Sequence, residues 1–313
     1  MLYIEENKKV ELMNSLNIPS LLAPYFDTFY NPDVLDVMYI LVNNRLSAEE
    51  ISKKLGYEAF DKIDKLYKDA IINKTSEDNA VKYELSTLFT RVNLMATFQR
   101  EVWENIPDEI RKKISEWHFG EFLDRKKKLD LSDISKNQNS IVPLNEAIDY
   151  LMSSDEDIYI IPCDCKSTSE NCNHSKNTCI TLGKSKAPSI ERGYGRKISK
   201  EEAIVILNDA DKEGLIHTIE SHAICNCCTC CCYPMRASKE LGLETVWPKV
   251  KYVVSIDEDK CVGCGLCSNK CQRNVFSLEN RKVNMNYDSC VGCGVCVNAC
   301  PKEALSLMPL GKS

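Results

Sequence analysis

Two stretches near the C-terminus decide the fold there: Cys261-Val-Gly-Cys-Gly-Leu-Cys-Ser-Asn-Lys-Cys271 and Cys290-Val-Gly-Cys-Gly-Val-Cys-Val-Asn-Ala-Cys300-Pro301. Each has the spacing C-x2-C-x2-C-x3-C, which is typical of segments that bind cubane iron–sulfur clusters. The first three cysteines of a run can curl around one cube. The fourth lies too far along the chain to reach that cube, so it ligates the other one.

We therefore expect two [4Fe–4S] clusters with crossed ligands. Cluster I would be bound by Cys261, Cys264, Cys267 and Cys300, and cluster II by Cys290, Cys293, Cys296 and Cys271. Glycines beside the cysteines allow the backbone to turn tightly and to direct amide N–H groups at the cluster sulfurs. A pair of zinc sites is the alternative, because C-x2-C pairs also bind zinc, but the doubled register of eight cysteines favours iron–sulfur clusters.

Residues 253–308 resemble the bacterial two-cluster ferredoxin domain, which implies electron transfer with redox partner proteins. Both cysteine runs fit the pattern of that family residue by residue. One departure is Gln272, at the position where the family usually has a proline after the fourth cysteine. Because this residue is not a ligand, the departure bears on local rigidity and not on cluster binding.

The composition sets limits on the rest of the chain. Its 313 residues suffice for two or three domains, and 43% hydrophobic with 27% charged residues is ordinary for a soluble globular protein. With a net charge of −6, the chain has no excess of positive charge that would attract nucleic acid or an anionic membrane. The N-terminus has acidic residues where a signal peptide needs basic ones, and no apolar run is long enough to span a membrane. We therefore expect a cytoplasmic protein, whose cysteines are metal ligands or redox thiols and not disulfides.

Residues 1–131 contain no cysteine and carry mainly helical signals. Ser47 and Glu50 predict a capping box at the start of one helix, and Gly56 predicts its end. The expected elements are helices over residues 32–43, 47–56 and 58–72 and a hairpin over residues 73–85. This order is that of a winged-helix domain, and residues 46–85 resemble that family.

The winged-helix resemblance raises the alternative of a redox-responsive DNA-binding regulator. Yet the third helix, which would read DNA, carries four acidic residues against three lysines and offers phosphates no net attraction. These residues are Glu58, Asp61, Asp64, Asp69, Lys62, Lys65 and Lys68. We therefore expect a helical module that docks a partner or a second copy of the chain, and we do not expect nucleic-acid binding.

A polar stretch over residues 132–140 predicts a linker to a cysteine-rich α/β domain at 141–250, followed by the ferredoxin-like domain at 251–313. A helix over 144–152 and a strand over 157–162 precede Cys163, Cys165, Cys172 and Cys179. A helix capped by Ser199 and ended by Gly214, and then an apolar run over 215–219, precede Cys225, Cys227, Cys228, Cys230, Cys231 and Cys232. If the two strands are parallel neighbours, all ten thiols meet at one edge of one sheet.

Three interpretations of these ten cysteines compete. The first is one or two further iron–sulfur clusters of the cubane type, which would extend an electron path. The second is a noncubane or substrate-binding cluster, and the third is zinc or a thiol relay. Histidines at 174, 217 and 222 are candidate ligands, although ordinary packing explains them as well. The chain has no phosphate-binding motif, and a flavin would need none.

The cysteine order of residues 163–232, followed by the two cysteine runs, resembles a family of uncharacterised ferredoxin-type iron–sulfur proteins of anaerobes. This resemblance covers residues 46–308 and implies cluster binding but no substrate. The cysteine order of residues 163–232 is also loosely similar to the cysteine-rich modules of heterodisulfide reductases. We thus predict an α+β protein in three parts that transfers electrons at low potential between the ferredoxin-like domain and the cysteine-rich site. The main alternative is an oxidoreductase that reduces a substrate at the site formed by residues 163–232.

Overall fold

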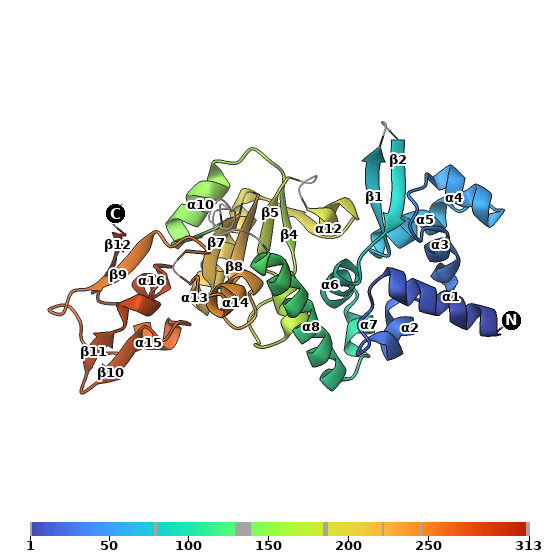
Figure 1. Ribbon diagram of the computed structural model, residues 1–313. Coiled ribbons are helices and arrows are strands. Elements are labelled where there is room, and N and C mark those ends of the chain that lie inside the picture. Colours follow the sequence, from blue (N-terminus) through green and yellow to red (C-terminus); the bar gives the residue numbers. More distant parts are fainter. Residues whose placement is uncertain are drawn as a thin grey trace. The chain divides into compact units, whose positions relative to one another are not determined.

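The computed structural model describes residues 2–77, 80–128, 139–183, 187–220, 222–244 and 246–310. Helices and strands are mixed along the chain, which agrees with the expected α+β class (Figure 1). The chain divides into two compact units, Met1–His118 and Phe119–Ser313, and the division falls within helix α8 (Asp108–Lys127). In the part of the chain that the structure describes, no helix combines the length and hydropathy that crossing a membrane requires.

The N-terminal unit, Met1–His118, is a set of helices with one β-hairpin. Strand β1 (Ile72–Glu77) pairs antiparallel with β2 (Ala80–Leu85), and Leu46 adds an isolated bridge to Tyr83. The helices are α1 (Leu2–Ser15), η1 (Ala23–Tyr25), α2 (Phe26–Phe29), η2 (Pro32–Val34), α3 (Leu35–Ile40), α4 (Ala48–Leu55), α5 (Phe60–Lys68), α6 (Leu88–Phe98), α7 (Arg100–Glu104) and the first part of α8.

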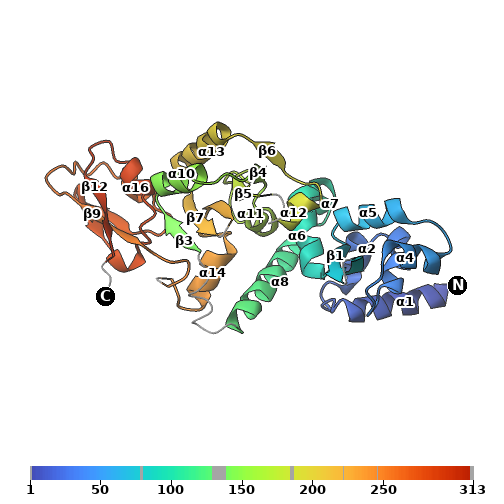
Figure 2. The same cartoon turned by 90° about the horizontal axis from the view of Figure 1, so that it is seen from above.

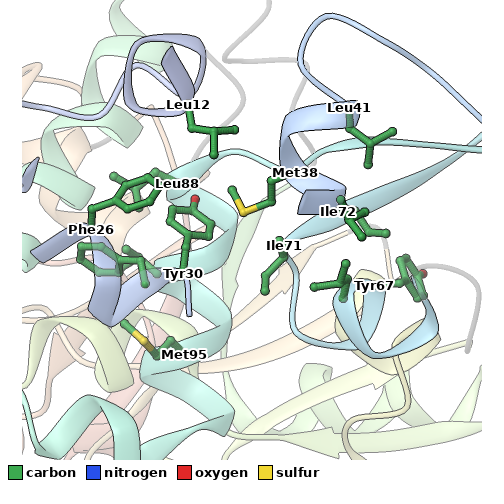
Figure 3. Packing of buried hydrophobic residues seen from close by; sticks show 14 of the residues in the cluster. Leu12, Phe26, Tyr30, Met38, Leu41, Tyr67, Ile71, Ile72, Leu88 and Met95 are labelled. Atoms are coloured by element: carbon green, nitrogen blue, oxygen red, sulfur yellow. The ribbon is translucent and has the colours of Figure 1, made fainter. Parts of the chain in front are cut away.

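One hydrophobic core holds this unit together. Leu12, Phe26, Met38, Leu88 and Met95 come from four different helices, and all are essentially buried (Figure 3). Burial of such side chains contributes roughly 1.5–3 kcal/mol each. The core therefore accounts for a compact unit that requires none of the cysteines.

The local signals of this unit are largely confirmed. Ser47 and Glu50 form both halves of the capping box of α4, and Gly56 ends the helix with φ of 77°. The helix expected over 32–43 is instead a 3-10 turn followed by the short helix α3. The hairpin is present, although its turn at 78–79 lies outside the described residues. The order of elements is the expected one, while the winged-helix resemblance itself stays a prediction.

The central part, residues 139–250 of the C-terminal unit, is built on a six-stranded antiparallel sheet with the strand order β3-β7-β8-β5-β4-β6. Its strands are β3 (Ser140–Val142), β4 (Ile158–Ile161), β5 (Cys179–Leu182), β6 (Arg196–Ile198), β7 (Ile216–Glu220) and β8 (Ala223–Cys227). Its helices are α10 (Leu144–Met152), α11 (Asp164–Ser169), α12 (Pro188–Glu191), α13 (Lys200–Glu213) and α14 (Tyr233–Glu240).

Two amphipathic helices pack on this sheet. Ala147 and Leu151 of α10 and Leu207 of α13 share a buried cluster with Ile158 and Ile180 of the strands, and Figure 2 shows the two helices side by side. The helix predicted over 144–152 is confirmed at both ends. The Ser199 cap and the Gly214 stop of α13 are confirmed as well.

The expectation that β4 and β7 are parallel neighbours is wrong. Strands β5 and β8 lie between them, and every pairing in the sheet is antiparallel. The chain reverses after Glu220, so the second cysteine group follows β8 and not β7. Because β8 runs in the same direction as β4, the end of β8, the end of β4 and the start of β5 still meet at one edge of the sheet.

The C-terminal part, residues 251–310, contains two small antiparallel pairs of strands and short helices. Strand β9 (Tyr252–Ile256) pairs with β12 (Leu305–Pro309), and β10 (Phe276–Glu279) pairs with β11 (Lys282–Met285). Helices α15 (Leu266–Lys270), α16 (Val295–Asn298) and the 3-10 turn η4 (Tyr287–Ser289) complete it. Just before this part, the chain runs beside β3, the edge strand of the central sheet. There the backbone N–H of Lys249 donates to Asn139 O, and Lys249 O accepts from Ile141 N.

Candidate metal centres

The four cysteines expected to bind cluster I line one cavity. Cys261, Cys264, Cys267 and Cys300 surround it together with apolar side chains such as Leu305. Cys261 and Cys264 come from the loop before α15, Cys267 lies in the first turn of that helix, and Cys300 is the last cysteine of the second run. The structure thus brings the crossed set together, and the four thiols fit a cubane that takes one thiolate at each iron.

The four cysteines expected to bind cluster II line a second cavity. Cys271, Cys290, Cys293 and Cys296 are joined there by Ile216 and other apolar groups of the central part. Burial raises the pKa of Cys293 to about 12 and raises that of Cys296 further. Buried thiols of this kind become thiolates when a metal replaces the proton, so the donor set also suits a cluster.

At two positions in these cysteine loops only glycine fits, because another segment of backbone lies directly opposite. A Cβ atom on Gly263 would lie 2.0 Å from Arg281 O, and one on Gly292 would lie 2.0 Å from Tyr252 O. Both glycines have positive φ, 66° and 61°. The tight loops that the sequence predicted are therefore present, and any side chain at these two positions would displace the backbone opposite.

The ten central cysteines separate into two groups, and the first is a group of four. The sulfurs of Cys172, Cys228, Cys230 and Cys231 all lie within 4.8 Å of one another. Cys172 Sγ is 3.6 Å from the sulfurs of both Cys228 and Cys231. The hydrogen bond with Cys231 lowers the pKa of Cys228 to about 5, whereas burial raises that of Cys230 to about 12. We call these residues the four-thiol site.

The remaining six cysteines interact with one another at the end of the sheet. Cys179 Sγ lies 3.7 Å from Cys225 Sγ across strands β5 and β8. Hydrogen bonds with Cys225 and Cys232 lower the pKa of Cys227, and a hydrogen bond with Cys163 raises that of Cys165. This six-thiol site consists of Cys163, Cys165, Cys179, Cys225, Cys227 and Cys232.

A buried lysine that the sequence reasoning missed lies near the six-thiol site, where its charge helps to lower the pKa of Cys227. Lys166 is 2% exposed, and its ammonium donates to Ser175 O, Thr178 Oγ1 and Asn226 O at 2.8–3.1 Å. Among the described residues no carboxylate lies within ion-pair distance of it. A buried cation without a carboxylate is costly, and thiolates bound to metal would supply the compensating negative charge. The only signal in the sequence is its place one residue after Cys165.

The candidate histidines have other partners. His174 Nδ1 lies 2.9 Å from Glu213 Oε1, and the fully buried His217 Nδ1 lies 2.6 Å from Asn226 Oδ1. His222 provides its backbone carbonyl to Leu182 N. Among the described residues, the group of metal-binding side chains that converges most closely consists of four cysteines and includes no histidine.

Cluster II and the six-thiol site share a hydrophobic contact. Val291 and Cys293, beside cluster II, pack in one cluster with Ile216, Cys225 and Cys227 of the central part. The cavity of cluster II is bounded by Gly214 and Ile216 of that part. The C-terminal part is thus docked with cluster II, and not cluster I, against the central cysteines.

Gln272 joins the same two parts by polar contacts. Its Oε1 accepts from Thr229 N at 2.8 Å, and its Nε2 donates to Gly214 O at 2.6 Å. Asn298 donates to both carboxylate oxygens of Asp211 nearby. The residue that stands in place of the usual proline therefore fixes the C-terminal part to the loop that carries Cys228 and Cys230, a role that sequence reasoning did not identify.

Comparisons with known proteins agree with the C-terminal site. Residues 254–307 match a family described as the 4Fe-4S dicluster domain. The chain is similar to Ferredoxin-2 of Desulfomicrobium norvegicum, with 47% identity over 32 residues, which are 10% of this chain and 54% of that protein. The chain thus spans about half the length of this curated relative. No solved structure matches the chain.

Proposed function

We propose that this protein transfers electrons at low potential between the two clusters of its ferredoxin-type part and a further iron–sulfur centre at the six-thiol site. The observation that carries the proposal is that Cys293 and Cys225 both pack against one buried cluster, which contains Cys227. The thiols assigned to cluster II and those of the six-thiol site thus border the same apolar cluster. This arrangement supports electron transfer between the two centres.

The exposure of the ligands suggests the order of the path. Cys264 of cluster I is exposed, whereas Cys296 of cluster II is buried. A redox partner protein would therefore approach cluster I, and electrons would pass through cluster II to the six-thiol site, or in the reverse order. Expectations of a cytoplasmic, anaerobic setting and of self-association through the N-terminal unit remain predictions.

The chain's residues fit these roles. Thiolates of the two cysteine runs would hold the cubanes, which supply one-electron chemistry when bound. Val254 N points at Cys290 Sγ at 3.5 Å, and Ala304 N points at Cys300 Sγ at 3.4 Å. Such donors stabilise the more negative, reduced state and raise the reduction potential. Lys166 would act in the same direction at the six-thiol site.

A second candidate is an oxidoreductase that reduces a substrate at the six-thiol site. One observation favours it: six cysteines exceed the four thiolates that a cubane uses. Two surplus thiols could bridge irons in an unusual cluster or act on a bound substrate. An iron with an open coordination position there would identify this function.

Iron and acid-labile sulfide in anaerobically purified protein test the proposal. We expect about twelve irons, of which eight belong to the ferredoxin-type part and four to the six-thiol site. Cys264→Ala and Cys293→Ala should each remove one ferredoxin-type cluster and retain the EPR signal of the third centre. A total of about eight irons in the parent protein would contradict a central cluster.

Reduction kinetics test the order of the centres. In Cys264→Ala, reduction of the third centre by a protein donor should become much slower, whereas a small chemical reductant should still reduce it. Equal rates in the parent and the variant with the protein donor would show that electrons do not enter at cluster I.

A further inference from the structure

We propose that the four-thiol site, formed by Cys172, Cys228, Cys230 and Cys231, binds a single zinc ion and not an iron–sulfur cluster. This site shares no cysteine with the six-thiol site, and the electron path proposed above does not include it. Its sulfurs are all within 4.8 Å of one another. Cys179 and Cys225 of the six-thiol site are also close, at 3.7 Å, but among the described residues no three of those six sulfurs converge mutually as these four do. The mutual convergence of all four sulfurs favours a single ion.

The distances match four thiolates on one metal. Sulfurs that surround one zinc ion tetrahedrally at about 2.3 Å are separated by roughly 3.8 Å. The contacts of Cys172 with Cys228 and with Cys231 are 3.6 Å each, and Cys230 and Cys231 are 3.9 Å apart. A cubane places each thiolate on a different iron and therefore spreads its ligands more widely. The four sulfurs are too close together to enclose such a cube.

The loops that carry these cysteines are held in place by groups other than the thiols. Asn171 Nδ2 donates to Cys230 O at 2.9 Å, and Ser169 Oγ donates to Cys231 O at 3.4 Å. On the other side, Thr229 N donates to Gln272. The backbone of both segments is thus fixed with the sulfurs converging, which favours a preformed site.

The ligand set also indicates a structural role. Four cysteines complete a tetrahedron and leave no position for a substrate, as in closed structural zinc sites. The ion would tie the segment after α11 to the segment after β8. It would thereby hold Thr229 in reach of Gln272 and stabilise the docking of the ferredoxin-type part.

Metal analysis of paired variants tests this inference. Protein should be produced with both metals supplied and purified anaerobically without a chelating column. We expect about one zinc ion per chain in the parent protein. Cys172→Ser should lose this zinc and keep the parent iron content. The matched variant Cys163→Ser, which changes the six-thiol site, should keep the zinc and lose iron.

X-ray absorption at the zinc edge of the parent protein gives a test that does not depend on the folding of a variant. Four sulfur neighbours at about 2.3 Å would support the site. Nitrogen or oxygen neighbours, absence of zinc, or a single iron in its place would overturn the zinc assignment. Loss of about four irons in Cys172→Ser with the zinc unchanged would show a cluster and would also overturn it.

Discussion

Truncation of Gln272 should loosen the contact between the ferredoxin-type part and the loop of the four-thiol site. Gln272→Ala removes one hydrogen bond from Thr229 N, at 2.8 Å, and one to Gly214 O, at 2.6 Å. A hydrogen bond of this kind contributes about 0.5–1.5 kcal/mol net. The two together predict a loss of about 1–2 kcal/mol, because an open groove of ≈ 560 Å³ lined by Thr229 and Gln272 admits water to the groups left unpaired.

Hydrogen exchange at the Thr229 amide measures this loss locally. A peptide that covers residues 228–232 should exchange about 5- to 30-fold faster in Gln272→Ala, which corresponds to 1–2 kcal/mol. Gln272→Pro, which introduces the residue common in two-cluster ferredoxins, should behave in the same way. Iron content should not change, because Gln272 is not a ligand.

Asn284 provides the matched control. It is exposed on β11, and its truncation in Asn284→Ala removes an amide side chain from the same part without touching the central loop. Exchange at residues 228–232 should be unchanged there. Equal exchange in the parent and Gln272→Ala would refute the reasoning, since it would show that Gln272 does not stabilise the contact.

The structure also predicts how three other substitutions change iron content, midpoint potential or stability. Gly292→Ala should cost about four irons, because its Cβ would lie 2.0 Å from a carbonyl oxygen, whereas Gly120→Ala, with open space around it, should leave the iron content unchanged. Lys166→Met should lower the midpoint potential of the central cluster by of the order of 60 mV, equivalent to about 1.4 kcal/mol for one electron, as removal of a cation disfavours the reduced state; an EPR redox titration that finds an equal or higher potential contradicts this. Glu146→Gln should destabilise the protein by about 1 kcal/mol near neutral pH, because it weakens contacts with Tyr252 and Lys251. Burial acts to raise the pKa of Glu146, but these two partners lower it below its ordinary value of 4.5. The stability difference between the two proteins is therefore complete above pH 4.5 and disappears as the pH falls through the lower folded pKa. Urea unfolding of both proteins as a function of pH measures this difference, and a constant difference down to acid pH would exclude the Glu146 carboxylate as its source.

Local signals in the sequence predicted local structure well. The helix Leu144–Met152, the Ser47 capping box and the glycine stop at Gly214 depend on residues within a turn of one another, and all three are present. The crossed assignment of the two cysteine runs could also be predicted from their spacing, because loops with such short spacings have few conformations.

Pairing of the strands could not be obtained in the same way. The chain reverses between Glu220 and Ala223, and the sequence there has none of the glycine, asparagine or proline signals of a hairpin turn. The apolar run over 215–219 and the cysteines from Cys225 onward therefore resembled one strand followed by a loop, and not two paired strands. Contacts such as Gln272 with Thr229 join residues far apart in the chain, and no periodicity indicates them.

The division of the central cysteines into two sites follows from the strand that carries them. Cys225 and Cys227 are two residues apart on β8, so their side chains point to the same face, where the six-thiol site lies. Cys228 follows the last residue of the strand, and its side chain turns to the other group, with Cys230 and Cys231. A run of adjacent cysteines would thus serve the two proposed centres, because neighbouring residues of an extended chain face opposite ways. Insertion of one residue between Cys225 and Cys227 should move a thiol from one site to the other, and loss of both iron and zinc in one variant is the expected result.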